Sequence, residues 1–282
     1  MPRPPRPLEE PYRSRAVPAA SARYFSWLFA APAMRAPLLG IFALIAEWRA
    51  LMDPAVELAS AQLKLAWWQE EIERLSRGAP VHPIGCYLAG LPRSPGVDFK
   101  PLSAAIEAAA RQIAGAPLEH GADIETHAAA LWAAPLLTGI ELAGGRSAGC
   151  QPAVRRSLAA VGAAQYLLAA IQDYRREARS GRVVFPVQEL LAANVENADL
   201  AADAAPVHLQ SYLEQLRRRA LAYFAESARL LPRAQHAPLR HVLVLAALDA
   251  RHLSGRRGAQ RFPGLHDLYL AWSTARRAAR RS

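Results

Sequence analysis

The sequence predicts an all-α, single-domain helical bundle. Alanine, leucine and arginine dominate its 282 residues and β-branched residues are sparse, a composition that favours helices. Apolar residues recur at helical spacing along most of the chain, and strand-like alternation extends no further than residues 183–185. No internal repeat or heptad is present. We therefore expect about eight to ten helices around one core, which a chain of this length can form.

An N-terminal arm precedes the expected helical domain. Residues 1–20 are rich in proline and arginine, so we expect a disordered arm there and the domain over residues 21–278. From Ser21 a helical pattern leads into an apolar helix over residues 38–53. Pro54 takes the first-turn position of the next helix, which runs down to residue 75. Further helices are expected over residues 82–89, 102–114, 118–142 with a kink at Pro135, 152–179, 187–195, 206–231, 238–253 and 265–281.

The charge of the chain restricts its partners. The formal net charge is +10, and much of the excess lies in arginines near the two ends of the chain. Such a balance is typical of proteins that bind nucleic acid, touch a membrane surface or receive anionic substrates. No zinc-finger, RNP or helix-turn-helix pattern accompanies the terminal arginines, so we predict no nucleic-acid partner.

Cysteine usage and hydropathy predict a cytoplasmic protein. The two cysteines lack a paired spacing, no signal peptide is apparent, and no run reaches the length of about 18 apolar residues that a spanning helix needs. Residues 265–281 are amphipathic, with Leu265, Leu268, Tyr269 and Trp272 on one face and arginines behind. This pattern fits core packing and also peripheral contact with an anionic membrane, so both interpretations stay open.

Asp173 and Glu177 form the most informative polar motif. They are four residues apart, so they lie on one face of the helix expected over residues 152–179. Two such carboxylates can share Mg²⁺, which prefers oxygen ligands and keeps waters or a substrate phosphate in its shell. Nearby arginines at 175, 176, 179 and 182 suit phosphate oxygens. The same pattern is also typical of a solvated face with ion pairs along the helix.

Three stretches together resemble the squalene/phytoene synthase family, over a region from about Tyr24 to Trp272. They are YFSWLF with the arginine of AAPAMRAPLLGIFAL, the segment KLAWWQEEIERL, and GAAQYLLAAIQDYRREARSGRVVFP. At the third stretch, family members carry a pattern close to Q-x-x-N-I-x-R-D-x-x-E-D-x-x-x-G-R-x-Y-x-P. The resemblance implies an isoprenoid-synthase-like bundle with a central apolar cavity. The residues that follow the family pattern in order are Gln165, Asp173, Glu177, Gly181, Arg182 and Pro186.

The resemblance implies Mg²⁺-dependent, head-to-head transfer between two prenyl diphosphates, so the expected partner is a prenyl diphosphate or a related lipid. Diphosphate leaves readily only when cations neutralise it, and the allylic cation left behind needs a dry, apolar tunnel. The resemblance assigns catalysis to Asp173 and Glu177, and metal binding to these two with Asp53. The substrate-binding residues that it implies are Arg35, Gln165, Arg179 and Arg182.

The first acidic motif departs from the family. Where the family carries D-D-x-x-D, residues 49–53 read RALMD, which keeps one carboxylate and adds Arg49. In the second motif, Ala169 and Gln172 stand where the family has asparagine and arginine. In these respects the chain resembles a divergent branch of the family that includes a mitochondrial complex I assembly factor and bacterial relatives. The alternative function is therefore that of a pseudoenzyme, a non-catalytic scaffold in the assembly of a membrane respiratory complex.

Two further groups on the helix after Pro54 are interpreted as structural. Trp67 and Trp68 share that helix with apolar neighbours, so at least one is expected in the core. The glutamates Glu70, Glu71 and Glu73 are expected on a solvated face.

Overall fold

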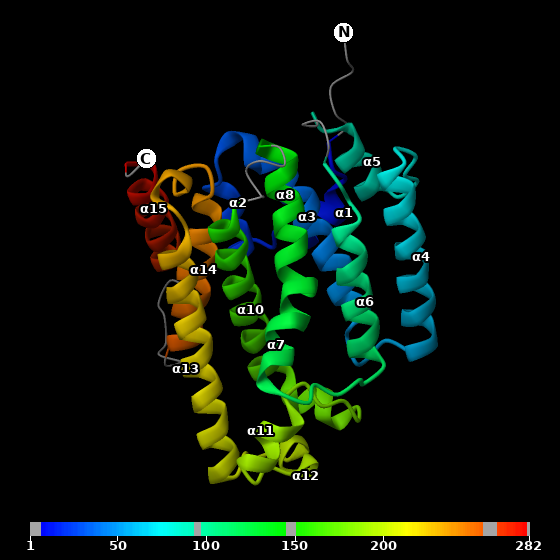
Figure 1. Ribbon diagram of the computed structural model, residues 1–282, viewed down its shortest axis with the longest axis vertical. Helices are drawn as coiled ribbons and strands as arrows, with labels where there is room; N and C mark the ends of the chain where they lie inside the picture. Colours follow the sequence, from blue (N-terminus) through cyan, green and yellow to red (C-terminus); the bar gives the residue numbers. More distant parts are fainter. Residues whose placement is uncertain (1–6, 93–96, 145–150, 256–263, 281–282) are drawn as a thin grey trace.

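The computed structural model describes residues 7–92, 97–144, 151–255 and 264–280, and every regular element in these ranges is helical (Figure 1). The predicted all-α fold is therefore confirmed. The helices are α1 (Glu10–Ala16), α2 (Ala22–Leu28), α3 (Pro32–Leu51), α4 (Leu58–Ser76), α5 (Pro83–Gly90), α6 (Pro101–Ile113), α7 (Gly121–Ala128), the π-helical turn η1 (Ala129–Ala133), α8 (Ala134–Gly144), α10 (Pro152–Arg179), α11 (Val187–Ala192), α12 (Asn197–Ala201), α13 (Val207–Leu230), the 3₁₀ turn η2 (Arg233–Gln235), α14 (Arg240–Ser254) and α15 (Leu265–Arg280).

The bundle is organised around α10. This helix packs most extensively against α13 and also contacts η1, α7, α12 and α14. On the other side of the core, α3 packs against α8 and α1. The short helices α11 and α12 lie at the lower end of the bundle in Figure 1, where α10 ends. Long antiparallel helices with short connections are the arrangement that buries one apolar stripe of each helix in a shared core.

The N-terminal segment differs from the expected disordered arm. Residues 10–16 form α1, and the flanking Leu8 and Val17 are buried together with Ala16. Arg15 forms an ion pair of 2.9 Å with Glu47 of α3. Pro11 fits the structure because it lies in the first turn of α1, where its missing N–H is not needed, and residues 1–6 of the expected arm lie outside the described residues.

A π-helical turn comes just before Pro135, where a kink is predicted. The N–H of Ala134 bonds to the carbonyl of Ala129, five residues back, so η1 contains one residue more than an α-helical turn allows. Gly162 of α10 lies against this turn, where a Cβ would come within 2.9 Å of the Ala128 carbonyl oxygen. The absence of a side chain at Gly162 therefore lets the two backbones approach closely.

The helix predicted from Pro54 begins later, at Leu58. The Asp53 carboxylate accepts a hydrogen bond of 2.9 Å from the Ala55 N–H, and the Asp53 carbonyl accepts another from Val56. These bonds form a turn that competes with helix initiation at Pro54. The turn fixes Asp53 just beyond the end of α3.

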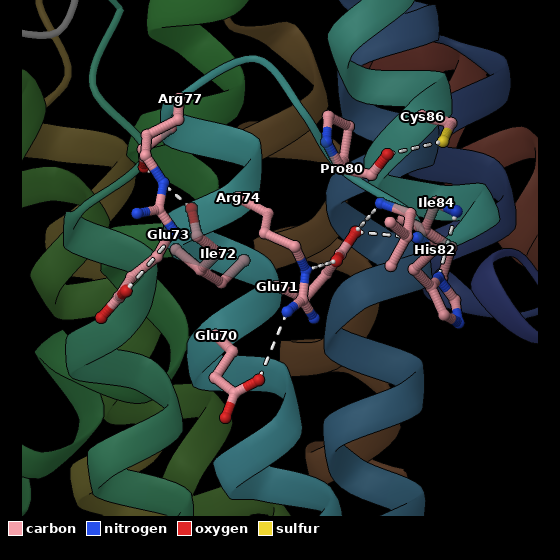
Figure 2. A network of polar contacts seen from close by, with 12 residues as sticks. Glu70, Glu71, Ile72, Glu73, Arg74, Arg77, Pro80, His82, Ile84 and Cys86 are labelled. Carbon is pink, nitrogen blue, oxygen red and sulfur yellow. Dashed lines mark hydrogen bonds and ion pairs between the residues drawn. The ribbon is translucent and has the colours of Figure 1, made fainter.

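Glu71 is not on a solvated face, so the prediction for this residue was wrong. Its side chain is fully buried and accepts hydrogen bonds from the N–H groups of Val81 and His82, at 2.9 and 2.8 Å (Figure 2). Arg74 donates to its other oxygen at 2.8 Å. Glu71 thus ties α4 to the chain entering α5. The expectation for Trp68 is confirmed, because only 5% of its surface is exposed.

No helix in the described part of the chain is long and apolar enough to cross a membrane. Cys86 is exposed and free, and Cys150 lies outside the described residues.

Candidate functional site

A small pocket lies where α3 and α10 end, and it contains the three predicted carboxylates. We call it the carboxylate pocket; its volume is about 70 Å³. Asp53 comes from the turn after α3, and Asp173 and Glu177 come from the last two turns of α10. The predicted residues are thus brought together from sequence positions more than a hundred residues apart. The other residues that line the pocket are Arg49, Met52, Gln112, Leu131, Trp132, Tyr166, Ala169, Ala170, Arg176 and Val184.

The end of α10 is built by a glycine turn. Gly181 has a φ of +80°, a conformation that favours glycine, and the Arg182 N–H returns to the Glu177 carbonyl at 3.0 Å. The Tyr166 hydroxyl donates to the Val184 carbonyl at 2.8 Å and holds the departing chain against α10. This turn points Arg182 back toward the pocket.

Glu177 is held by Arg182. The Arg182 Nε lies 2.7 Å from Glu177 Oε2, and both side chains are largely buried. Arg182 also donates to the Met52 carbonyl at 2.9 Å, which links the ends of α10 and α3. Burial raises the pKa of Glu177, and the Arg182 charge opposes this shift.

Arg176 bridges the other two carboxylates. Its Nη1 lies 2.9 Å from Asp53 Oδ2, and its Nη2 lies 3.4 Å from Asp173 Oδ1. Each of these side chains is about one-third to one-half exposed, so the pairs are accessible to solvent. Arg176 thus joins the two acidic segments. Its pair with Asp173 is of the kind expected from the alternative interpretation, in which charged residues form ion pairs along the helix.

The carboxylate pocket does not fit a divalent cation. Glu177 is engaged by Arg182, and Asp53 and Asp173 are engaged by Arg176. Over the ranges that the structure describes, no group of three or more histidine, cysteine or acidic side chains is placed to hold a metal ion. Hard cations such as Mg²⁺ need free carboxylate oxygens, so the Mg²⁺ site implied by the family resemblance is not formed by these side chains.

A larger cavity lies beside the carboxylate pocket, enclosed by α2, α3, α8, α10 and α14. We call it the central cavity; its volume is about 310 Å³. One part of its lining is apolar and the other part is strongly polar. The apolar residues are Ala22, Phe42, Ile45, Trp132, Leu136, Leu168 and Leu245, and the polar ones are Ser21, Arg23, Arg49, Gln165, Gln172, Asp249 and His252.

Arg49 and Trp132 line both spaces. The Arg49 guanidinium carbon lies 5.2 Å from the centre of the Trp132 ring, a cation–π distance. Desolvation lowers the pKa of Arg49, and the charges of Asp173 and Asp249 oppose that shift. Among the described residues, neither Asp173 nor Glu177 forms an ion pair with Arg49. The positive charge of Arg49 therefore faces both the carboxylate pocket and the central cavity.

Arg23 adds a second positive charge to the central cavity. Its Nη1 is buried and finds no hydrogen-bond partner among the described residues. Burial, with help from the nearby Arg49, lowers the pKa of Arg23 to about 10, and Asp249 opposes the shift. A buried guanidinium nitrogen without a partner is costly, so this position is suited to an anionic ligand.

Asp249 is the buried carboxylate of the central cavity. It accepts a short hydrogen bond from Gln165, and His252 lies 3.9 Å away. Burial raises the pKa of Asp249 to about 6, while Gln165, His252, Arg23 and Arg49 oppose the shift. Gln165, for which the family resemblance implies substrate binding, thus lies in the central cavity.

Two predicted substrate-binding arginines lie away from both cavities. Arg35 donates to the Leu28 carbonyl at 3.2 Å and holds the connection between α2 and α3. Arg179 donates to the Ala201 carbonyl at 3.1 Å and pairs with Asp203 at 2.6 Å, at the end of α12. Both side chains serve local structure in these positions.

The sequence interpretation missed Arg23 and Asp249. Both are charged residues within otherwise buried helix faces. Arg23 follows the buried Ala22 of α2, and Asp249 is spaced by helical turns from the buried Val242 and Leu245 of α14. A charged residue that lies three, four or seven positions from apolar core residues shares their helix face, and this pattern in the sequence marks such positions.

Comparison with known proteins identifies the family. The family model for squalene/phytoene synthase matches residues 17–271. The chain therefore belongs to the squalene/phytoene synthase family. No curated protein matches the chain.

Two solved structures share the fold. A dehydrosqualene synthase in complex with a ligand has a TM-score of 0.67 at 14% identity, over 95% of this chain and 99% of that one. The squalene synthase HpnC from Alicyclobacillus acidocaldarius has a TM-score of 0.62 at 18% identity, over 94% of this chain and 92% of that one. The isoprenoid-synthase-like architecture is thus confirmed.

Proposed function

We propose that this protein binds a prenyl diphosphate in the central cavity. The observation that carries the proposal is the buried Nη1 of Arg23, which lies beside an apolar lining and has no hydrogen-bond partner in the described part of the chain. The isoprenoid chain lies along Phe42, Leu168 and their apolar neighbours, and the diphosphate lies between Arg23 and Arg49. Such an amphiphile satisfies both parts of the cavity, which a purely apolar or purely polar ligand does not.

The same arrangement supports the prenyl transfer typical of the family. Arg23 and Arg49 neutralise charge on the departing diphosphate, and the apolar lining keeps water from the allylic cation. In this proposal, Asp173 and Glu177 act by orienting Arg176 and Arg182. They do not contact the substrate themselves.

Calorimetry with farnesyl and geranylgeranyl diphosphate tests the binding. We expect Arg23→Gln to weaken binding by at least about tenfold, because a hydrogen bond to a charged group is lost in a buried site. Arg35→Gln is the matched control, since Arg35 lies outside the cavity. Equal loss in the two variants, or no binding by the unchanged protein, contradicts the proposal.

A non-catalytic scaffold is the second candidate function. The observation that favours it is the pairing of all three pocket carboxylates with arginines. Incubation with farnesyl diphosphate separates the two candidates. Release of diphosphate together with a condensed product excludes a purely scaffolding role. Binding of farnesyl diphosphate without turnover supports the non-catalytic candidate.

We also propose that the protein contacts an anionic membrane through α15. Leu265, Tyr269 and Trp272 are 60%, 67% and 43% exposed on this helix, and Arg276 stacks on Trp272 at 5.0 Å. Exposed aromatic residues beside arginines suit the interface of a bilayer with anionic headgroups. The prenyl diphosphate partner is itself an amphiphile that partitions toward membranes.

Sedimentation with vesicles tests this contact. We expect the protein to sediment with phosphatidylglycerol vesicles and to remain free with phosphatidylcholine vesicles, because anionic lipid attracts the arginines. Trp272→Ser should reduce the bound fraction. Leu63→Ser removes an even more exposed apolar side chain, from α4, and should have no effect. A similar loss in both variants contradicts the assignment to α15.

A further inference from the structure

We infer that this chain binds its anionic ligand without a divalent cation. Arg176 and Arg182 hold the carboxylates on which the family resemblance would place the metal, and Arg23 and Arg49 supply the positive charge. The identity of the ligand rests on the proposed function. The statement about the metal rests only on the side chains of the carboxylate pocket.

Arg176 occupies the position between the two acidic segments. Its two terminal nitrogens contact Asp53 at 2.9 Å and Asp173 at 3.4 Å, so one guanidinium spans the ends of α3 and α10. A cation that joined these segments would compete with Arg176 for the same two carboxylates. The planar guanidinium of Arg176 donates to both carboxylates at once. A metal ion could bind the two carboxylates from this position only by displacing Arg176.

Glu177 is withdrawn from the pocket as a ligand. Only 5% of its surface is exposed, and Arg182 contacts it at 2.7 Å. Arg182 is itself fixed by the Met52 carbonyl. Movement of Glu177 to a metal would leave the buried Arg182 charge without an opposite charge, which is strongly unfavourable.

The formal charges of the pocket cancel. Asp53, Asp173 and Glu177 contribute three negative charges. The lining residues Arg49 and Arg176, together with Arg182, which pairs with Glu177 from outside the lining, contribute three positive ones. A pocket without net negative charge does not concentrate a dication, whereas Arg49 still attracts an anion from the side that faces the central cavity.

A Mn²⁺ titration followed by electron paramagnetic resonance tests the inference without any ligand. We expect the full chain to leave millimolar Mn²⁺ free in solution. Arg176→Gln releases Asp53 and Asp173 and should tighten Mn²⁺ binding by at least about tenfold, because a repelling charge within a few ångströms is removed. Arg179→Gln is the control, since Arg179 lies one turn further along α10 and pairs with the exposed Asp203. Binding of Mn²⁺ by the unchanged protein that is lost in Asp173→Asn overturns the inference.

Calorimetry with farnesyl diphosphate in EDTA and in millimolar Mg²⁺ gives the second measurement. We expect dissociation constants that agree within about twofold, since the diphosphate is neutralised by arginines. A tenfold or greater gain in affinity with Mg²⁺ overturns the inference. If farnesyl diphosphate binds in neither buffer, the proposed function fails, and the Mn²⁺ titration still decides whether the pocket takes a metal.

Discussion

Individual buried charges determine much of the behaviour of this protein. Glu71, Glu177 and Asp249 are carboxylates in the interior, and each meets a different environment. Glu71 faces backbone N–H groups and an arginine, Glu177 faces one arginine, and Asp249 faces an amide and more distant charges. A buried carboxylate is tolerated when hydrogen bonds or opposite charges replace its water.

Glu71 is expected to contribute strongly to stability. Glu71→Ala leaves the Val81 and His82 N–H groups and the Arg74 Nε–H without their acceptor, so we expect the free energy of unfolding to fall by about 2–5 kcal/mol. Urea denaturation measures this change. Glu73→Ala, at an exposed position two residues further on, should change it by about 0.5 kcal/mol or less. Equal effects in the two variants would show that the Figure 2 network has no special role.

Asp249 should make stability depend on pH. Its pKa rises from 3.8 to about 6 on folding, so the folded state binds the proton more tightly and stability falls as pH rises through this range. Asp249→Asn removes the ionisation. We therefore expect the variant to gain about 2–3 kcal/mol relative to the unchanged protein between pH 4 and pH 7.

Urea denaturation at the two pH values, with Asp203→Asn as an exposed control, measures this difference. A constant difference between Asp249→Asn and the unchanged protein would contradict the raised pKa.

At the scale of elements, the contact between α10 and the π-helical turn η1 positions the site. Trp132 of η1 lines both cavities, and its place depends on how closely η1 approaches α10. Gly162 permits that approach, because a Cβ there would meet backbone atoms of Ala128 and Ala133. Backbone moves less readily than the end of a side chain.

Gly162→Ala should therefore destabilise the fold. We expect a loss of about 1–3 kcal/mol from overpacking, despite the higher helix propensity of alanine. Gly139→Ala on α8 is the matched control, since its Cβ would meet the Ile41 side chain at 3.1 Å. That variant should change stability by about 1 kcal/mol or less. Thermal unfolding of both variants measures the effects, and the opposite order of stability would contradict this account.

At the scale of the whole molecule, the central cavity joins helices from both halves of the chain. Its lining comes from α2 and α3 as well as from α10 and α14. A ligand there contacts elements that are far apart in the sequence. Its binding should therefore stabilise the whole bundle and not one segment of it.

Farnesyl diphosphate at about 100 times its dissociation constant should raise the free energy of unfolding by about 2.7 kcal/mol. Denaturation with and without ligand measures this change. Inorganic diphosphate lacks the chain and farnesol lacks the charge, so each should stabilise less at the same concentration. Equal stabilisation by inorganic diphosphate would place the prenyl chain outside the cavity.

Local patterns in the sequence account for the fold class and for part of the site. Helical periodicity predicts most helices, and Gly181 with Arg182 marks the turn after α10. Asp53, Asp173 and Glu177 line the carboxylate pocket and Gln165 lines the central cavity, and the roles that the family resemblance implies for them stay predictions.

The sequence by itself determined the all-α fold class, because spacing within a helix states which residues share a face. The family was indicated by the resemblance of its motifs, above all the stretch from Gln165 to Pro186. Only the tertiary structure decided which charges meet. Arg176 reaches Asp53 across 123 positions of sequence, and Arg23 lies in the same cavity as Asp249. Such pairs depend on how helices pack against each other, and spacing along one helix does not specify the partner on another. The sequence predicts a metal site at Asp53, Asp173 and Glu177, with arginines nearby. Only the packed bundle shows that Arg176 also pairs with Asp53 and that Arg182 also binds the Met52 carbonyl.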